Sequence, residues 1–427
     1  MSKSMPFVRG LLGALTVGAL AVVAGCATTP EPQATSTPSA SAAPETPEPY
    51  AGPIAFVGDE LEWFLFSADE ITAIFPNVGN VNAPDAAFEQ ISDGGGPNPD
   101  PEICSALIAE PSLGSIGTRS VSWTSSASDD QDGRLEVLQF ADEEAVQSRM
   151  DQYVKAASQC GEFRFNNAST FDSTVLDSED GVQAIAGSLV IDSGSYQSYQ
   201  GYAAVGNVLV SFWQPFTGDS ALDSDAVAAS LMERASEAKT KLIDELTANP
   251  PVPAEVPSEV DASAPWSEWQ ITAAGVGPIR LGVELDEAIA SVPDARVEEP
   301  EWEGGPTRLV SPDGNASVVL QRAEGQSAVS AIAVGFANVA GDRNHDGAAL
   351  PSADGVRVGD PVAAAVEAFP EGTMLRVVSS AEDFYVWSTR EGVLLRFRAD
   401  RDVTEEGAVI TGIQVEDATL QKAPVFG

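Results

Sequence analysis

An internal repeat in the C-terminal part of the chain constrains the fold most strongly. Residues 277–282 and 355–359 align, and each segment is followed by an amphipathic stretch that ends at a proline, Pro293 or Pro370. The two prolines are 77 residues apart, and other matched positions keep the same spacing. Alternating apolar residues downstream predict three or four strands in each half. We therefore expect two helix-plus-sheet repeats, at about 275–340 and 352–420.

Proline-rich stretches divide the 427-residue chain further. Residues 248–265 read as a linker between one domain at 54–247 and the repeat domain at 266–427. In the first domain, a capping box begins at Ser67, Asp142 precedes an amphipathic helix, and Gly206-Asn207 interrupts a strand pattern as a hairpin turn does. Helices and strands alternate irregularly, which predicts an α+β protein of two domains, each an antiparallel sheet packed with helices.

The N-terminus predicts export. A positive start is followed by the uncharged residues 10–25, too short to span a bilayer at ~20 residues, and then by Cys26. Val23-Ala24-Gly25-Cys26 resembles the lipobox of bacterial lipoproteins. This resemblance implies a signal peptide at 1–25, a diacylglyceryl group and further acyl chains such as palmitate on Cys26, and attachment to the extracytoplasmic side of the cell membrane. Residues 26–53 are a Pro/Thr/Ser-rich tether.

Two cysteines remain after Cys26, at positions 104 and 160. In an oxidising compartment Cys104 and Cys160 are expected to pair. Closing a loop of this length contributes roughly 4 kcal/mol in the chain-entropy model. A metal-binding or catalytic thiol is the alternative, but no histidine lies nearby.

Charge and composition argue against two functional classes. A formal net charge of −42 repels phosphate backbones, so we expect no nucleic-acid partner. A single histidine excludes most His-based catalytic triads, and no phosphate-binding glycine motif or Cys/His metal spacing occurs. We expect a protein that is not an enzyme and that holds no cofactor, calcium being the one exception considered.

Aromatic residues suggest two binding surfaces. Tyr196, Tyr199 and Tyr202 lie in a Gly/Ser-rich segment, where exposed rings could stack on a glycan or line a cleft, whereas packed rings would close a hairpin. Tyr385 and Trp387 share one strand face and would suit either a protein-binding sheet or the core. Both alternatives stay open in each case.

The loop at 341–347 has the spacing of a calcium loop. Asp342, Asn344 and Asp346 occupy its first, third and fifth positions, but Ala353 stands where a bidentate acid is needed. Two interpretations follow: an incomplete, weak Ca²⁺ site, or a bare turn, which the composition favours.

Two family resemblances add to this picture. Residues 65–71, with Cys104 before the first strands and Cys160 at a helix end, resemble the extracellular sensor domain of PknH-type kinases. The family's second disulfide and the tryptophan near its helix-end cysteine are missing here. This resemblance implies a cleft-bearing sensor module without catalysis. The C-terminal duplication resembles the repeats of the β-lactamase inhibitory protein family and, more distantly, the BamE fold, whose sheets bind proteins.

These observations lead to one main hypothesis and one alternative. The main hypothesis is a membrane-anchored envelope lipoprotein with a non-catalytic, sensor-like role, binding an unknown small ligand or envelope protein. The alternative is a structural or inhibitory scaffold that binds an envelope enzyme or assembly partner through the repeat-domain sheet.

Overall fold

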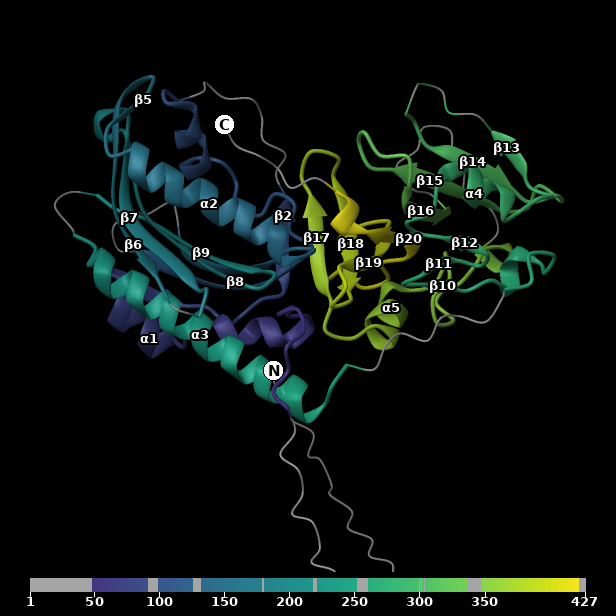
Figure 1. Cartoon of the computed structure of the whole chain (residues 1–427), viewed down its shortest axis with the longest axis horizontal. Coiled ribbons are helices and arrows are strands. Elements are labelled where there is room, and N and C mark those ends of the chain that lie inside the picture. The colour runs from purple at the N-terminus through teal and green to yellow at the C-terminus, as the bar shows by residue number, and fades with distance from the viewer. Residues whose placement is uncertain are drawn as a thin grey trace, which may run out of the picture. The chain divides into compact units, whose positions relative to one another are not determined.

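The computed structural model describes residues 48–90, 99–125, 132–178, 180–217, 221–251, 260–298, 300, 302, 304–335 and 347–421. All of them belong to one compact unit (Figure 1). Among these residues no helix is both long enough and apolar enough to cross a membrane. The mixture of antiparallel sheets and packed helices confirms the predicted α+β class.

Within the described residues, eight strands form the first sheet, and every neighbouring pair in it is antiparallel. Their order is β1 (Val78–Val81), β3 (Gly117–Ser125), β4 (Gly133–Gln139), β9 (Val208–Pro215), β8 (Tyr196–Val205), β7 (Gln183–Ile191), β6 (Asn167–Asp177) and β5 (Phe163–Phe165). Gly206 and Asn207 make the turn between β8 and β9, which confirms the hairpin expected there.

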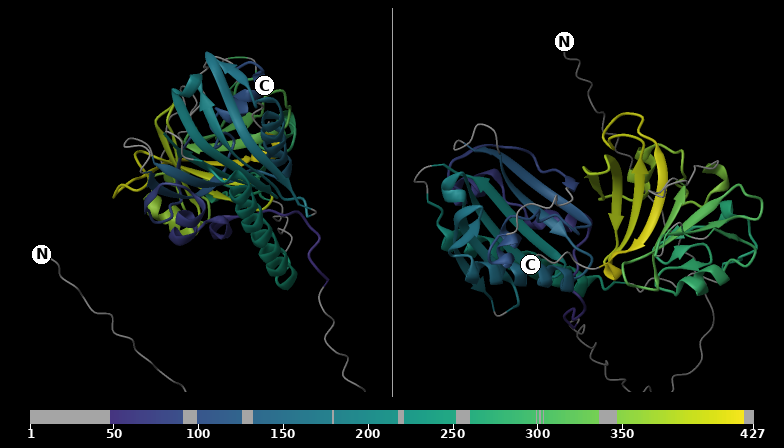
Figure 2. Two further views of the ribbon diagram at one scale, coloured as in Figure 1. Left: turned by 90° about the vertical axis from the view of Figure 1, so that its left-hand side faces the viewer. Right: turned by 90° about the horizontal axis from the view of Figure 1, so that it is seen from above.

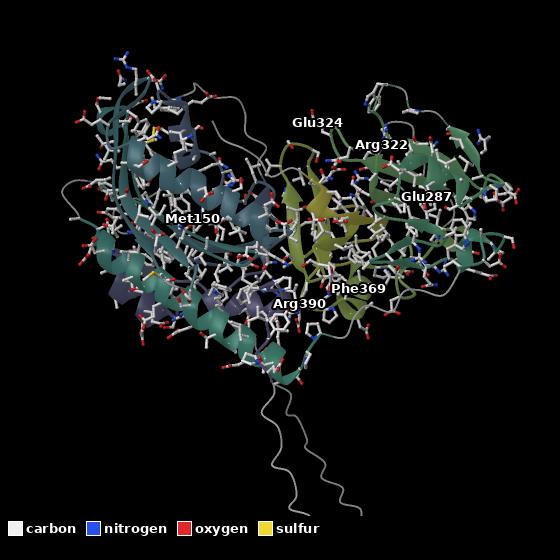
Figure 3. All side chains as sticks on the ribbon, in the orientation of Figure 1. Met150, Glu287, Arg322, Glu324, Phe369 and Arg390 are labelled. Atoms are coloured by element: carbon white, nitrogen blue, oxygen red, sulfur yellow. A yellow bond between two sulfur atoms is a disulfide. The ribbon has the colours of Figure 1, made fainter. Side chains whose placement is uncertain are left out.

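Helices cover both faces of this sheet (Figures 1 and 2). One face packs against α2 (Glu143–Gln159) and the short 3₁₀ helix η2 (Glu102–Leu107). The other packs against α3 (Ser224–Ala248), α1 (Ala68–Ile74) and η1 (Gly58–Phe64). Met150 of α2 is fully buried in the first of these cores (Figure 3).

The local signals read from the sequence form as expected. The Asp142 carboxylate accepts a hydrogen bond from Ala145 N at 2.8 Å and begins α2. Ser67 and Glu70 form a reciprocal capping box at α1. Cys104 of η2 and Cys160 at the end of α2 are joined by the predicted disulfide, with an S–S distance of 2.01 Å.

The second sheet shows the repeat. A short helix followed by four strands occurs twice: α4 (Leu285–Ala290) precedes the first set, and α5 (Val362–Ala368) precedes the second. The strands are β13 (Arg296–Glu298), β14 (Thr307–Val310), β15 (Ser317–Arg322) and β16 (Val329–Gly335), then β17 (Thr373–Val377), β18 (Glu382–Ser388), β19 (Val393–Ala399) and β20 (Ile410–Asp417). β16 pairs with β20 and joins the two halves. A separate small sheet precedes α4 in the chain. It consists of β10 (Ile271–Thr272), β11 (Gly275–Val276) and β12 (Ile279–Arg280).

One strand of the second sheet comes from far earlier in the chain. β2 (Ala87–Gln90) pairs with β17 in parallel, with Phe88 opposite Leu375. Phe88 packs in a buried cluster that also includes Ile116 and Ala141 from the first half and Phe384 from β18. The expected domain boundaries stay predictions, because residues from both sides of the 248–265 segment form this one cluster and one compact unit.

Candidate functional site

A cavity of about 510 Å³ opens on the face of the first sheet that also carries α2. Its walls come from the end of η2 and the loop after it, including Leu107 and Glu110, and from strands β4, β7, β8 and β9. This volume lies within the roughly 300–1,000 Å³ typical of small-molecule sites.

Strand register brings the polar and aromatic lining residues together. Arg134 on β4 lies opposite Trp213 on β9, and Trp213 lies opposite Gln200 on β8. Two residues further along these strands, Ser211 on β9 lies opposite Tyr202 on β8, which gives a second row beside the first. Directly paired residues of neighbouring strands project from the same face, so both rows face the cavity. All five residues line it.

Tyr196 and Trp213 form the aromatic wall of the cavity. Trp213 Nε1 donates a hydrogen bond to Tyr196 Oη at 2.9 Å, and the ring centroids are 6.4 Å apart at an interplanar angle of 25°. Both side chains are half-buried. Burial raises the pKa of the Tyr196 hydroxyl, although the bond from Trp213 opposes the shift. The wall is therefore a pair of rings that are held in a fixed orientation and are partly exposed to the cavity.

The deeper part of the cavity is hydrogen-bonded. Tyr202 Oη donates to Gln200 Oε1 at 3.2 Å, and Gln200 Nε2 donates to the carbonyl of Leu107 at 3.0 Å. The Tyr202 ring stacks on Tyr153 of α2 with centroids 3.7 Å apart. Burial raises the pKa of Tyr153 to about 12 and that of Tyr202 well above 10. Both phenols therefore stay protonated at neutral pH.

Arg134 is the cation of the cavity. Its guanidinium lies 5.8 Å from the ring centroid of Trp213, 3.7 Å from a Glu110 oxygen and 3.5 Å from a Glu136 oxygen. Burial raises the pKa of Glu136, and Arg134 lowers it in part. Arg134 Nε is buried and has no hydrogen-bond partner. Two carboxylates thus hold the guanidinium by charge, and the Arg134 side chain is 42% exposed.

The three tyrosines predicted from the sequence divide between the two faces of β8. Tyr196 and Tyr202 line the cavity. Tyr199 is fully buried on the opposite face, where its ring stacks on Phe216 with centroids 4.2 Å apart. Successive strand residues point to opposite faces, so residue 199 cannot share a face with residues 196 and 202 in this strand.

Sequence reasoning missed Arg134 and Trp213. Trp213 lies in the strand pattern that Gly206-Asn207 interrupts, whereas no strand was predicted at Arg134. The signal available at both positions was a polar or aromatic residue that alternates with buried ones. Nothing in the sequence placed these two strands side by side.

Tyr385 and Trp387 lie against the core. The Tyr385 hydroxyl donates to Phe369 O at 2.5 Å and accepts from Gly372 N at 3.0 Å, and its side chain is buried. Trp387 is half-buried, and its ring lies 5.5 Å from that of Phe369 (Figure 3). Of the two alternatives given for Tyr385, a protein-binding surface or the core, the structure therefore shows the core position.

Other predicted sites lie outside the described residues. Cys26 and the loop residues Asp342, Asn344 and Asp346 belong to this group, so lipidation and calcium binding stay predictions. Within the part of the chain that the structure describes, no cluster of three or more His, Cys, Asp or Glu side chains is suited to a metal ion.

Comparison with known proteins gives only distant similarities. No protein-family model matches the chain, and no curated protein matches it. The chain is similar to the extracellular domain of PknH from Mycobacterium tuberculosis, with 11% identity, a TM-score of 0.30, and coverage of 46% of this chain and 100% of that one.

A putative uncharacterized protein from Mycobacterium smegmatis matches with 11% identity and a TM-score of 0.26, over 43% of this chain and 97% of its own. The expected resemblance to the PknH sensor domain thus recurs as a weak structural similarity. The resemblance of the repeats to β-lactamase inhibitory protein and BamE stays a prediction.

Proposed function

We propose that this protein is an extracytoplasmic, membrane-anchored lipoprotein that binds a small ligand in the cavity beside α2 without transforming it. The observation that carries the proposal is the convergence of Arg134, Trp213 and Gln200, from three neighbouring strands, on a cavity of about 510 Å³. Polar side chains that converge with aromatic ones on a concave surface are typical of ligand sites.

The bonding of the cavity's hydroxyl groups supports binding over catalysis. Ser195 Oγ donates to the carbonyl of Ile191, and Tyr202 Oη donates to the Gln200 amide oxygen. Tyr196 Oη accepts from the Trp213 indole. An activated nucleophile needs a general base within hydrogen-bond reach, and none of these hydroxyls bonds to a histidine or carboxylate.

The anchor is the second part of the proposal. It rests on the short apolar run and the small residues before Cys26. Mass spectrometry of the mature N-terminus tests it: a diacylglyceryl-modified Cys26 is expected, and an intact residue 1 or an unmodified Cys26 in the membrane fraction would contradict it.

Ligand binding is tested by native mass spectrometry of the full chain after incubation with an envelope extract. We expect the wild type to carry an added mass that corresponds to a bound small molecule, and we expect Trp213→Ala to lack it. Trp302→Ala is the matched control, because Trp302 is 56% exposed and lies outside the cavity. Equal retention by Trp213→Ala, or no retained species, would overturn the proposal.

The scaffold alternative has less support. Part of the sheet that it would use is occupied by the chain itself, because β2 pairs along the edge of β17 and Phe88 packs with Leu375 and Phe384. A partner would have to use the strands of the first repeat.

A further inference from the structure

We propose that the ligand of this cavity is an uncharged, polyhydroxylated ring, that is, a neutral saccharide unit. The inference rests on the proposed function and names the chemical class of its ligand. Three properties of the lining lead to it: a fixed aromatic wall, planar polar groups around it, and a charge balance that disfavours anions.

The aromatic wall suits the apolar face of a sugar ring. The hydrogen bond from Trp213 Nε1 to Tyr196 Oη holds the two rings at 25° to one another, and both remain half-buried. A sugar ring presents C–H groups on one face, and these pack against the negative face of an aromatic ring. Because the wall is already ordered, binding costs little side-chain entropy there.

Planar polar side chains surround the aromatic wall. Arg134, Glu110, Asp192 and Gln200 all line the cavity. A hydroxyl group both donates and accepts, so neighbouring hydroxyls can bond to a carboxylate and to a guanidinium at once. Arg134 faces its carboxylates at 3.5 and 3.7 Å and has a buried Nε without a hydrogen-bond partner. The hydroxyl groups of a ligand would bond to the accessible part of the Arg134 side chain, which is 42% exposed.

The charge of the lining decides against an anion. The guanidinium of Arg134 faces the carboxylates of Glu110 and Glu136, and Asp192 adds a further carboxylate to the cavity lining. The formal charge of the whole chain is −42, so its field repels anionic ligands.

The same groups disfavour a lipid chain. An apolar occupant would cover Arg134 and Glu110 without giving hydrogen bonds in return, and burial of charged groups without such bonds is unfavourable. The cavity's volume of about 510 Å³ lies in the range of small-molecule sites.

The test is a titration of the full chain with defined probes, in which tryptophan fluorescence and isothermal calorimetry detect binding. The neutral probes are glucose, N-acetylglucosamine, maltose and trehalose. Glucuronate and glucose 6-phosphate are the anionic probes, and myristate is the lipid probe. We expect saturable binding of at least one neutral saccharide, with at least tenfold weaker binding of the anionic analogues.

Variants connect binding to the cavity. Trp213→Ala is expected to weaken binding at least tenfold, and Arg134→Lys at least fivefold because the planar guanidinium is lost. Trp213→Phe keeps an aromatic ring but loses the hydrogen bond to Tyr196, so its affinity is expected to lie between those of the wild type and Trp213→Ala, which separates loss of the ligand contact from loss of the fold. Trp302→Ala is the control and is expected to bind as the wild type does.

The outcomes are distinct. Binding of myristate or of an anionic probe in place of neutral saccharides, abolished by Trp213→Ala, would overturn the saccharide inference and leave the ligand-binding function standing. Absence of binding by every saccharide probe would also overturn the inference. If the envelope extract yields no ligand either, the proposed function fails with it.

Discussion

The guanidinium of Arg390, a residue labelled in Figure 3, is paired with the carboxylate of Glu60, 330 residues earlier in the chain. Arg390 Nη1 donates to Glu60 Oε2 at 2.8 Å, Nη2 bonds to Oε1, and Nη1 also bonds to the carbonyl of Ala55. Glu60 in turn accepts from Val57 N at 2.9 Å. This bidentate pair fastens the turn between β18 and β19 to η1.

Replacing Arg390 with methionine is expected to lower the free energy of unfolding by about 2 kcal/mol, because the carboxylate of Glu60 would lose its charged donors. The Glu60 side chain is only 16% exposed, so water compensates poorly. Urea unfolding followed by tryptophan fluorescence measures the change. Arg401→Met, which removes a pair between sequence neighbours at the surface, is the control and should change little. An Arg390→Met variant as stable as this control would show that the pair contributes nothing.

Removing the disulfide by the double substitution Cys104→Ala and Cys160→Ala is expected to cost roughly 4 kcal/mol. The bond closes a separation of 56 residues and ties η2, which forms part of the cavity wall, to the end of α2. Thermal unfolding of the oxidised wild type, the reduced wild type and the variant gives the measurement. The reduced wild type should behave as the variant does, and a variant that melts with the oxidised protein would refute this.

The turn between β8 and β9 tolerates only glycine at position 206. Gly206 has φ of +53°, and a Cβ there would lie 2.1 Å from the carbonyl oxygen of Ile54. We expect Gly206→Ala to destabilise the protein by about 2 kcal/mol or more, from backbone strain together with a clash.

Gly181→Ala is the matched control for that substitution. Gly181 also has positive φ, +82°, but its Cβ would meet nothing within 4 Å. It should cost about 1 kcal/mol, from strain alone. Denaturant midpoints of the two variants decide the matter: equal losses would show that the approach of Ile54 has no effect.

The buried carboxyl of Glu136 makes stability depend on pH. Burial raises its pKa in the folded state above the 4.5 of the free group, so the folded state binds the proton more tightly than the unfolded state. Its contribution to stability is therefore greatest below pH 4.5 and declines as the pH rises through the folded-state value.

We expect Glu136→Gln to melt at a higher temperature than the wild type at pH 7, with the difference shrinking towards pH 4. Melting curves across this range provide the test. Asp151→Asn, an exposed residue on α2, controls for loss of a negative charge. A pH-independent difference would mean that desolvation of the Glu136 carboxylate is not the cause.

The sequence by itself determined the local elements of this protein. Helix caps at Ser67 and Asp142 and the Gly206 turn depend on residues within a few positions of one another, so their signals are readable in the chain. The 77-residue spacing likewise showed the order of helix and strands in each repeat. The disulfide was indicated because two cysteines remain after Cys26.

Only the tertiary structure decided where distant segments meet. The cavity row of Arg134, Trp213 and Gln200 needs β9 to lie between β4 and β8, and this order depends on pairing between segments that are far apart in the chain. Tyr202 enters the cavity and Tyr199 the opposite core because strand register assigns alternate residues to opposite faces. The pairing of β2 with β17 likewise depends on the joint burial of Phe88 and Leu375, which no local pattern encodes.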